Sequence, residues 1–167
     1  MPQPLCDAIH AKIHEQIERI EHLILLVPPE SMEWAPPIDQ PWTIQQLLEH
    51  LVGCLAGFCA VLYAMRPEQL AHFQELRKLD PVAQPNRDQI LNRLHLFSGK
   101  IVEGFDQLED CVLSQVLPTV FVPEGESGMT LLLGNLEHLI NHKYQLFTDL
   151  RLMGLKVNSS DLYRFRG

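Results

Sequence analysis

The chain has 167 residues, of which 46% are hydrophobic and 20% are charged, values that suit a globular domain with a sizeable core. Its formal net charge of −8 argues against a nucleic-acid partner, because phosphate contacts need clustered Lys and Arg. No run approaches the roughly 18 consecutive apolar residues of a membrane-spanning helix, and the N-terminus lacks signal-peptide features. We therefore expect a single domain over residues 1–167 that is cytoplasmic and does not enter a membrane.

The first half of the chain predicts two long helices joined by a proline-rich connection. Isoleucines at helical spacing indicate a helix from about Leu5 to Val27, which Pro28-Pro29 ends. After the connection, Thr43 is a suitable N-cap for a second helix that reaches about Met65. Four cysteines without C-x-x-C spacing favour free thiols in a reducing compartment.

The second half predicts two more helices. An irregular crossover, with a short extra helix after Pro67, precedes a third helix that begins at Asn86 or Asp88 and reaches about Glu109. Residues 116–128 contain valines and two glycines and indicate an extended or hairpin-like segment. A fourth helix follows from about residue 129 to 153, and the tail from about residue 155 is expected to be irregular. The fold class is therefore an all-α four-helix bundle with a long crossover between its second and third helices.

A polar stripe on the fourth predicted helix suggests a metal site. Its members fall within an arc of roughly 80° on a helix of 3.6 residues per turn. They are Asn135, His138, His142, Gln145 and Asp149. Histidines at i and i+4 present two imidazoles to one divalent metal.

A third ligand would have to come from another helix. His50 lies at the border of the apolar face of the second predicted helix, beside Gly53, Cys54 and Gly57. These small residues predict a cavity next to His50, provided that the second and fourth helices are neighbours in the bundle.

A second i, i+4 pair, His10 and His14, is a weaker alternative. It lies beside Lys12 and Glu15 on the first predicted helix, so a solvated flank is the favoured interpretation.

Two segments of the chain resemble the DinB-like proteins, four-helix-bundle metalloproteins that include the YfiT group. Pro41-Trp42-Thr43-Ile44-Gln-Gln-Leu-Leu-Glu-His50-Leu is similar to their W-S/T-I-x-E-L-L-x-H-L segment. The stretch from His138 to Gly154 resembles their H-x-x-x-H-R-G-Q…L-R-x-x-G ending, with Lys143-Tyr144 in place of the frequent Arg-Gly. The resemblance implies a divalent metal held by His50, His138 and His142.

Three histidines leave a coordination position open, as in catalytic sites. Zinc and nickel are the first metals to consider, although imidazole ligands also suit iron and manganese. Among DinB-like proteins, activities include transfer reactions of low-molecular-weight thiols, and many members are labelled hydrolases. The resemblance thus implies a metal-dependent transferase or hydrolase acting on a small molecule, with a low-molecular-weight thiol as a candidate co-substrate, and it is compatible with a homodimer. The alternative is a non-catalytic bundle in which the metal stabilises the fold or the pocket binds a small ligand.

Other members of the site have two interpretations each. Gln145, Asp149 and Asn135 either orient the imidazoles or contact substrate, or they make ordinary polar contacts between helices. Cys54 either lines the pocket or binds the metal, and a small buried residue beside the site is the favoured interpretation. Trp42 either walls the cavity or anchors the proline-rich connection.

Overall fold

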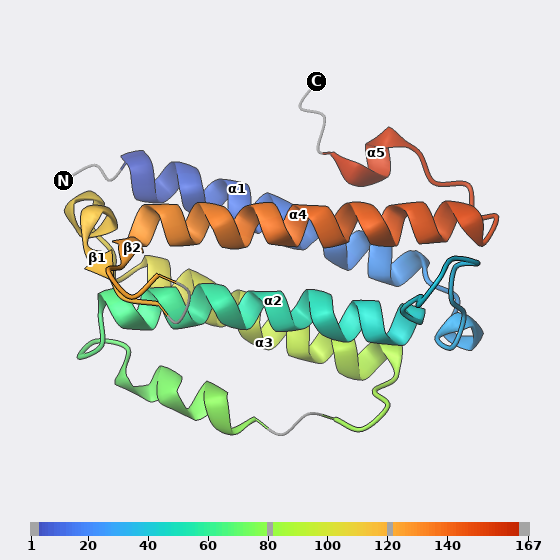
Figure 1. Cartoon of the computed structure of the whole chain (residues 1–167), viewed down its shortest axis with the longest axis horizontal. Helices are drawn as coiled ribbons and strands as arrows, with labels where there is room; N and C mark the ends of the chain where they lie inside the picture. The colour runs from blue at the N-terminus through green and yellow to red at the C-terminus, as the bar shows by residue number, and fades with distance from the viewer. Residues whose placement is uncertain (1–3, 80–81, 120–121, 164–167) are drawn as a thin grey trace.

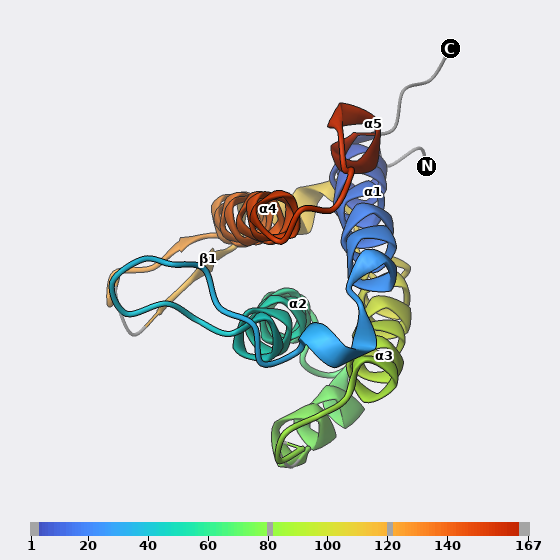
Figure 2. The same ribbon diagram turned by 90° about the vertical axis from the view of Figure 1, so that its right-hand side faces the viewer.

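The computed structural model describes residues 4–79, 82–119 and 122–163. Most of these lie in four long helices, which form the all-α four-helix bundle predicted from the sequence. The helices are α1 (Pro4–Leu26), α2 (Ile44–Met65), α3 (Arg87–Phe105) and α4 (Gly128–Leu152). Viewed along the bundle, α2 packs against α3 and α4, and α1 closes the ring by contacting the same two helices (Figure 2). The second and fourth helices are therefore neighbours, as a site shared between them requires.

The connections decide which way each helix runs. The crossover after α2 contains a 3-10 helix, η2 (Ala71–Lys78), and returns the chain to the end of the bundle where α2 begins (Figure 1). As a result α2 and α3 run in the same direction, whereas α4 runs antiparallel to α2 (Figure 1).

The start of α2 is held by a capping box and by the proline-rich connection. Thr43 Oγ1 accepts a hydrogen bond from the Gln46 backbone N–H, and the Gln46 side chain accepts one from the Thr43 N–H. The connection includes η1 (Pro29–Ser31) and supplies two further acceptors for the start of the helix. The Ile44 N–H donates to the Trp34 carbonyl, and the Gln45 N–H donates to the Met32 carbonyl. These bonds fix the first turns of α2, including the turn that carries His50.

The segment before α4 is the hairpin-like element that the sequence predicts. It follows η3 (Asp110–Ser114) and contains two short antiparallel strands, β1 (Val116–Leu117) and β2 (Glu126–Ser127). Ser127 then caps α4 by accepting from the Thr130 N–H. The α3 helix ends at Phe105, four residues before the predicted end at Glu109. After Phe105 the backbone hydrogen bonds join residues i and i+3, as from the Leu108 N–H to the Phe105 carbonyl, and Leu108 is still buried.

The core residues of α2 make it unusually apolar. One 18-residue window of α2 has a mean hydropathy of 1.8, so by length and composition it would suit a membrane span. Its apolar side chains are those of a core helix, with Leu51, Leu55 and Phe58 essentially inaccessible inside the bundle. Counting consecutive apolar residues does not detect this helix, because Glu49 and His50 interrupt the run.

The tail is more ordered than the sequence analysis expected. After residues 155–158, a short helix α5 (Ser159–Leu162) begins with a capping box between Asn158 and Asp161. It packs on α1, where Leu162 is buried and Asp161 Oδ1 lies 2.8 Å from His22 Nε2.

Candidate metal centre

Three histidines converge in the groove between α2 and α4. His50 Nε2 lies 3.1 Å from His138 Nε2 and 3.1 Å from His142 Nε2. The three rings meet edge to face, at interplanar angles of 74°, 76° and 80°. His138 and His142 are one turn apart on α4, and α2 presents His50 to both. The structure thus brings together the three residues that the sequence analysis singled out.

The donor set fits a divalent cation. Metal–nitrogen bonds of about 2.0–2.1 Å place two ligands of a tetrahedral site about 3.3 Å apart, close to the separations found here. Hydrogen bonding alone would satisfy this arrangement poorly, because a neutral imidazole has a single N–H to share. His142 Nδ1 lies 3.0 Å from Gln145 Oε1, so it donates its proton there and leaves a lone pair on Nε2.

The electrostatics favour a neutral imidazole at His50. Burial, followed by the neighbouring His142 and His138, lowers the pKa of His50. A neutral imidazole is the form that binds a metal, and no proton must leave it at neutral pH.

No fourth protein ligand joins the three histidines among the residues that the structure describes. In those ranges, His50, His138 and His142 form the sole group of three or more His, Cys, Asp or Glu side chains in metal-binding geometry. Cys54 is half-buried, and burial raises the pKa of its thiol to about 11. A protonated thiol is a poor nucleophile, and Cys54 does not belong to the group of side chains in metal-binding geometry.

Trp42 covers one side of the histidines. Its ring centroid lies 4.9 Å from that of His50 and 5.6 Å from that of His142, with the latter pair nearly parallel at 19°. The side chain remains 40% exposed, so it also forms part of the surface beside the centre. These contacts support the interpretation of Trp42 as a wall of the site.

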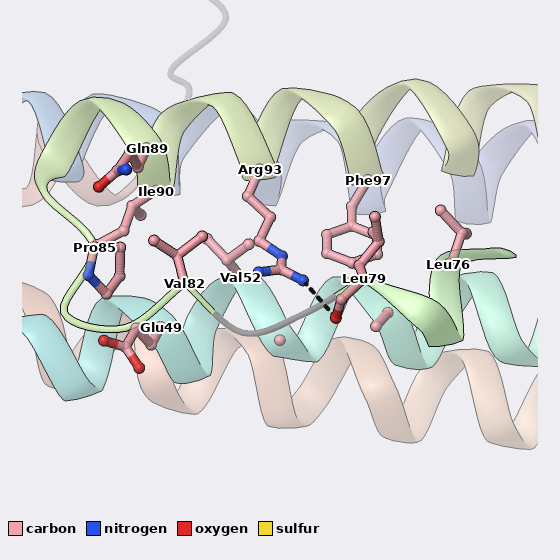
Figure 3. Close-up of a pocket in the computed structure, with 12 residues that line it drawn as sticks. Glu49, Val52, Leu76, Leu79, Val82, Pro85, Gln89, Ile90, Arg93 and Phe97 are labelled. Atoms are coloured by element: carbon pink, nitrogen blue, oxygen red, sulfur yellow. Dashed lines mark hydrogen bonds between the residues drawn. The ribbon is translucent and has the colours of Figure 1, made fainter.

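The small-residue niche predicted beside His50 is not where the sequence analysis placed it. At Gly57 a Cβ atom would lie 3.2 Å from Asn135 Nδ2, so the Asn135 side chain already fills that position between α2 and α4. Gly53 is exposed and lines a cavity between α2 and α3 (Figure 3). It lies about 60° from His50 around α2, so only the packing of the crossover and α3 reveals that it borders a different space.

Lys143 also points away from the histidines, although it follows His142 directly. Its side chain is buried, and Nζ donates to Gln16 Oε1 at 2.7 Å and to the Leu162 carbonyl at 2.9 Å. Burial lowers the pKa of Lys143 to about 8. The sequence analysis missed this buried lysine, yet its position gave a signal: Lys143 occupies a place in the apolar stripe of α4 between Leu139 and Leu146.

The other histidines of the described ranges have local partners. His10 stacks on Phe105 with ring centroids 4.7 Å apart, and His14 Nδ1 lies 3.9 Å from Glu18. Among the described residues, no third possible ligand joins the i, i+4 pair on α1. His22, His72 and His95 pair with Asp161, Glu103 and Glu21 respectively.

Fold and site together define a class of protein: an antiparallel pairing of α2 and α4 in a four-helix bundle, with two histidines from one helix and one from the other. Two solved structures are similar to the chain in fold. A DinB-like protein, YjoA, from Bacillus subtilis matches with a TM-score of 0.70 and 18% identity, over 95% of this chain and 96% of that one. A candidate member of the DinB family from Exiguobacterium sibiricum matches with a TM-score of 0.60 and 21% identity, over 95% and 97%.

The chain therefore has the DinB-like fold, and the resemblance seen in the two histidine segments is confirmed at the level of the fold. No protein-family model matches the sequence, and no curated protein matches it.

Asp149, the last member of the polar stripe, has a buried carboxyl group. It lies about two turns beyond His142 on α4, and burial raises its pKa from 3.8 to about 6. Because the folded protein binds this proton more tightly than the unfolded chain does, the carboxyl lowers the free energy of unfolding as pH rises from 3.8 to about 6. At neutral pH the carboxylate is charged and costs stability.

We expect Asp149→Asn to raise the free energy of unfolding at pH 7 by about 1–3 kcal/mol. The gain should shrink toward zero as the pH falls to 3.5, because the native carboxyl is then largely protonated in both states. Urea unfolding between pH 3.5 and 7.5 measures this, with Asp39→Asn, an exposed carboxyl, as the matched control. A gain that is independent of pH would contradict the assignment.

Proposed function

We propose that the protein is a metal-dependent enzyme that acts on a small molecule and uses a metal at His50, His138 and His142 to activate a thiolate or a water. The observation that carries this proposal is a three-histidine set without a fourth protein ligand among the described residues. A stabilising metal site normally closes its coordination shell with protein groups, whereas a catalytic site keeps a position for water or substrate. Zinc and nickel are the metals we favour, since both accept imidazole ligands.

Each residue around the centre has a role in this proposal. A bound divalent metal would supply a Lewis acid that lowers the pKa of a water or thiol ligand. Gln145 holds His142 in the tautomer that directs Nε2 to the centre, by accepting the Nδ1 proton. Trp42 excludes water from one side, and the exposure of His138 leaves the other side accessible to a small molecule. Neither Cys54 nor Asp149 is needed as a ligand.

Turnover by the metallated protein tests the proposal. We expect protein loaded with zinc or nickel to consume a low-molecular-weight thiol in the presence of an aryl halide or epoxide, or to hydrolyse an activated ester. The rate should fall at least about 100-fold in His138→Ala, because the loss of several kcal/mol of activation corresponds to a factor of this size. The measurements are loss of free thiol, followed with a chromogenic reagent, and release of the leaving group of the ester.

His14→Ala is the matched control, since it removes an exposed imidazole on α1 that lies outside the centre. Its rate should equal that of the parent protein. If the fully metallated protein shows no turnover with any thiol, electrophile or ester, the proposal of enzymatic activity is overturned. That result would favour a non-catalytic bundle that the metal stabilises.

A further inference from the structure

The side chain of Asn135 lies across α2 beside the candidate metal centre. A Cβ atom at Gly57 would lie 3.2 Å from Asn135 Nδ2 and 3.4 Å from Oδ1, so the amide packs directly over that glycine. Along α4, Asn135 is one turn from His138, and the Cβ atoms of residues so spaced are about 5–6 Å apart. Because glycine leaves this place to the amide, Asn135 lies next to the centre on the side where α4 begins.

The hydrogen-bonding groups of this amide are unused within the part of the chain that the structure describes. An asparagine side chain carries two N–H donors and a carbonyl acceptor. The side chain of Asn135 is half-buried and makes no hydrogen bond to any described residue. Gln145, at the other end of the stripe, instead accepts a hydrogen bond from His142 Nδ1 at 3.0 Å. Asn135 is thus the amide of the stripe that is available to a molecule bound at the centre.

The walls of the centre direct such a molecule toward Asn135. Trp42 packs on the rings of His50 and His142, at the end of the α2–α4 pair where α2 begins. His138 and Asn135 lie farther toward the start of α4, and the side chain of His138 is exposed. A ligand that enters the open coordination position therefore extends away from Trp42, along the side that Asn135 lines.

We propose that Asn135 is a specificity-determining residue for the thiol: its carboxamide pairs with an amide group of a small thiol whose sulfur takes the open position of the metal. An amide is the complement of this side chain, because it accepts from Nδ2–H and donates to Oδ1 at the same time, whereas a carboxylate only accepts. The thiol binds as a thiolate, and its proton passes to the solvent. This inference rests on the proposed function in its thiol form.

Thiol binding to cobalt-loaded protein tests this inference without turnover. Co²⁺ accepts imidazole ligands, and a thiolate that joins it adds an absorption band in the near ultraviolet. The two probes are mercaptoacetamide and isobutanethiol, which have the same number of non-hydrogen atoms and differ in the amide. The readout is the ratio of their dissociation constants, compared between proteins, so that intrinsic differences between the two thiols cancel.

Asn135→Leu removes the amide and keeps a side chain of similar size. We expect the variant to bind cobalt as the parent protein does and to lower the preference for mercaptoacetamide at least about tenfold, because the paired hydrogen bonds are lost. An unchanged ratio would mean that Asn135 only packs between the helices and would overturn the proposal. Loss of cobalt by the variant would mean that the amide supports the metal itself, which would overturn the proposal as well.

Gly57→Ala tests the placement of the amide from the other helix. The new Cβ atom would lie 3.2 Å from Asn135 Nδ2 and would displace the amide, while alanine favours the helix. We expect the preference for mercaptoacetamide to fall about threefold, because misaligned hydrogen bonds are weaker, and to change no further when Gly57→Ala is added to Asn135→Leu. Gly53→Ala on the same helix is the matched control, since a Cβ atom there meets nothing within 4 Å. Equal ratios in Gly57→Ala and Gly53→Ala would overturn the placement.

Failure of this inference differs from failure of the proposed function. Cobalt-loaded protein that prefers mercaptoacetamide through Asn135 but turns over no substrate would support the inference and refute the enzyme. Protein that turns over thiols, with equal binding ratios in the parent and in Asn135→Leu, would overturn the inference and leave the enzyme.

Discussion

Alanine at position 138 is expected to abolish stoichiometric metal binding. His138 contributes one of three Nε2 atoms, and His50 Nε2 lies 3.1 Å from it. Two imidazoles remain, and among the described residues no other His, Cys, Asp or Glu belongs to the group in metal-binding geometry. Because even a residue that only orients a ligand is worth about 10–100-fold in metal affinity, loss of a ligand should cost more than about 100-fold.

Elemental analysis of purified, dialysed protein is the measurement. We expect about one zinc or nickel per chain for the parent protein and for His14→Ala, and a background level for His138→Ala. Undiminished metal in the His138 variant would sink the assignment of the centre.

Metal should also stabilise the protein through the same three residues. At a free metal concentration about 1,000 times Kd, binding to the folded state adds about 4 kcal/mol to the free energy of unfolding. Thermal unfolding should therefore shift upward with zinc in the parent protein, and the shift should disappear in His138→Ala.

A large loss of stability is expected when Phe58, in the middle of α2, is truncated. Its side chain is fully buried, and α2 packs extensively on both α3 and α4. Truncation to alanine removes the transfer free energy of the ring and leaves a cavity that the surrounding helices fill only in part. Phe58→Ala should therefore lower the free energy of unfolding by about 3–5 kcal/mol.

Chemical unfolding monitored by circular dichroism measures this loss. Leu133→Ala on α4, where the side chain is 45% exposed, is the control and should change stability by no more than about 0.5 kcal/mol. A loss below about 1 kcal/mol for Phe58→Ala would mean that the core around α2 collapses to fill the space.

Much of the bundle could be predicted because local rules agree with the tertiary structure. Thr43 and Asn86 cap the helices that they were expected to begin, and Gly154 adopts the positive φ of 87° that suits a helix end. The convergence of His50 with the fourth-helix pair was also predictable, since helical spacing aligned the pair and the resemblance joined the two segments. The alignment of side chains on one face can be predicted from the helical period alone.

The remaining features depend on contacts between distant segments. Gly53 and Gly57 looked alike in the sequence, but Asn135 from α4 fills the space at Gly57, whereas Gly53 is exposed and a Cβ atom there would meet nothing within 4 Å. Which face of α2 each residue occupies follows from helical rotation, whereas what lies opposite depends on how the chain returns. Lys143 could be placed on a buried stripe but could not be assigned its acceptors, which come from α1 and α5.

The hydrogen bond from Lys143 to the Leu162 carbonyl also bears on where the chain can be shortened. The end of α4 at Leu152 and the turn at Gly154 look like a natural boundary for a deletion variant. A chain cut there would lose Leu162 from the core and one of the two acceptors of a buried ammonium group, which then retains only Gln16. The folded domain thus extends at least to Leu162, and a C-terminal fusion partner should be attached after that residue.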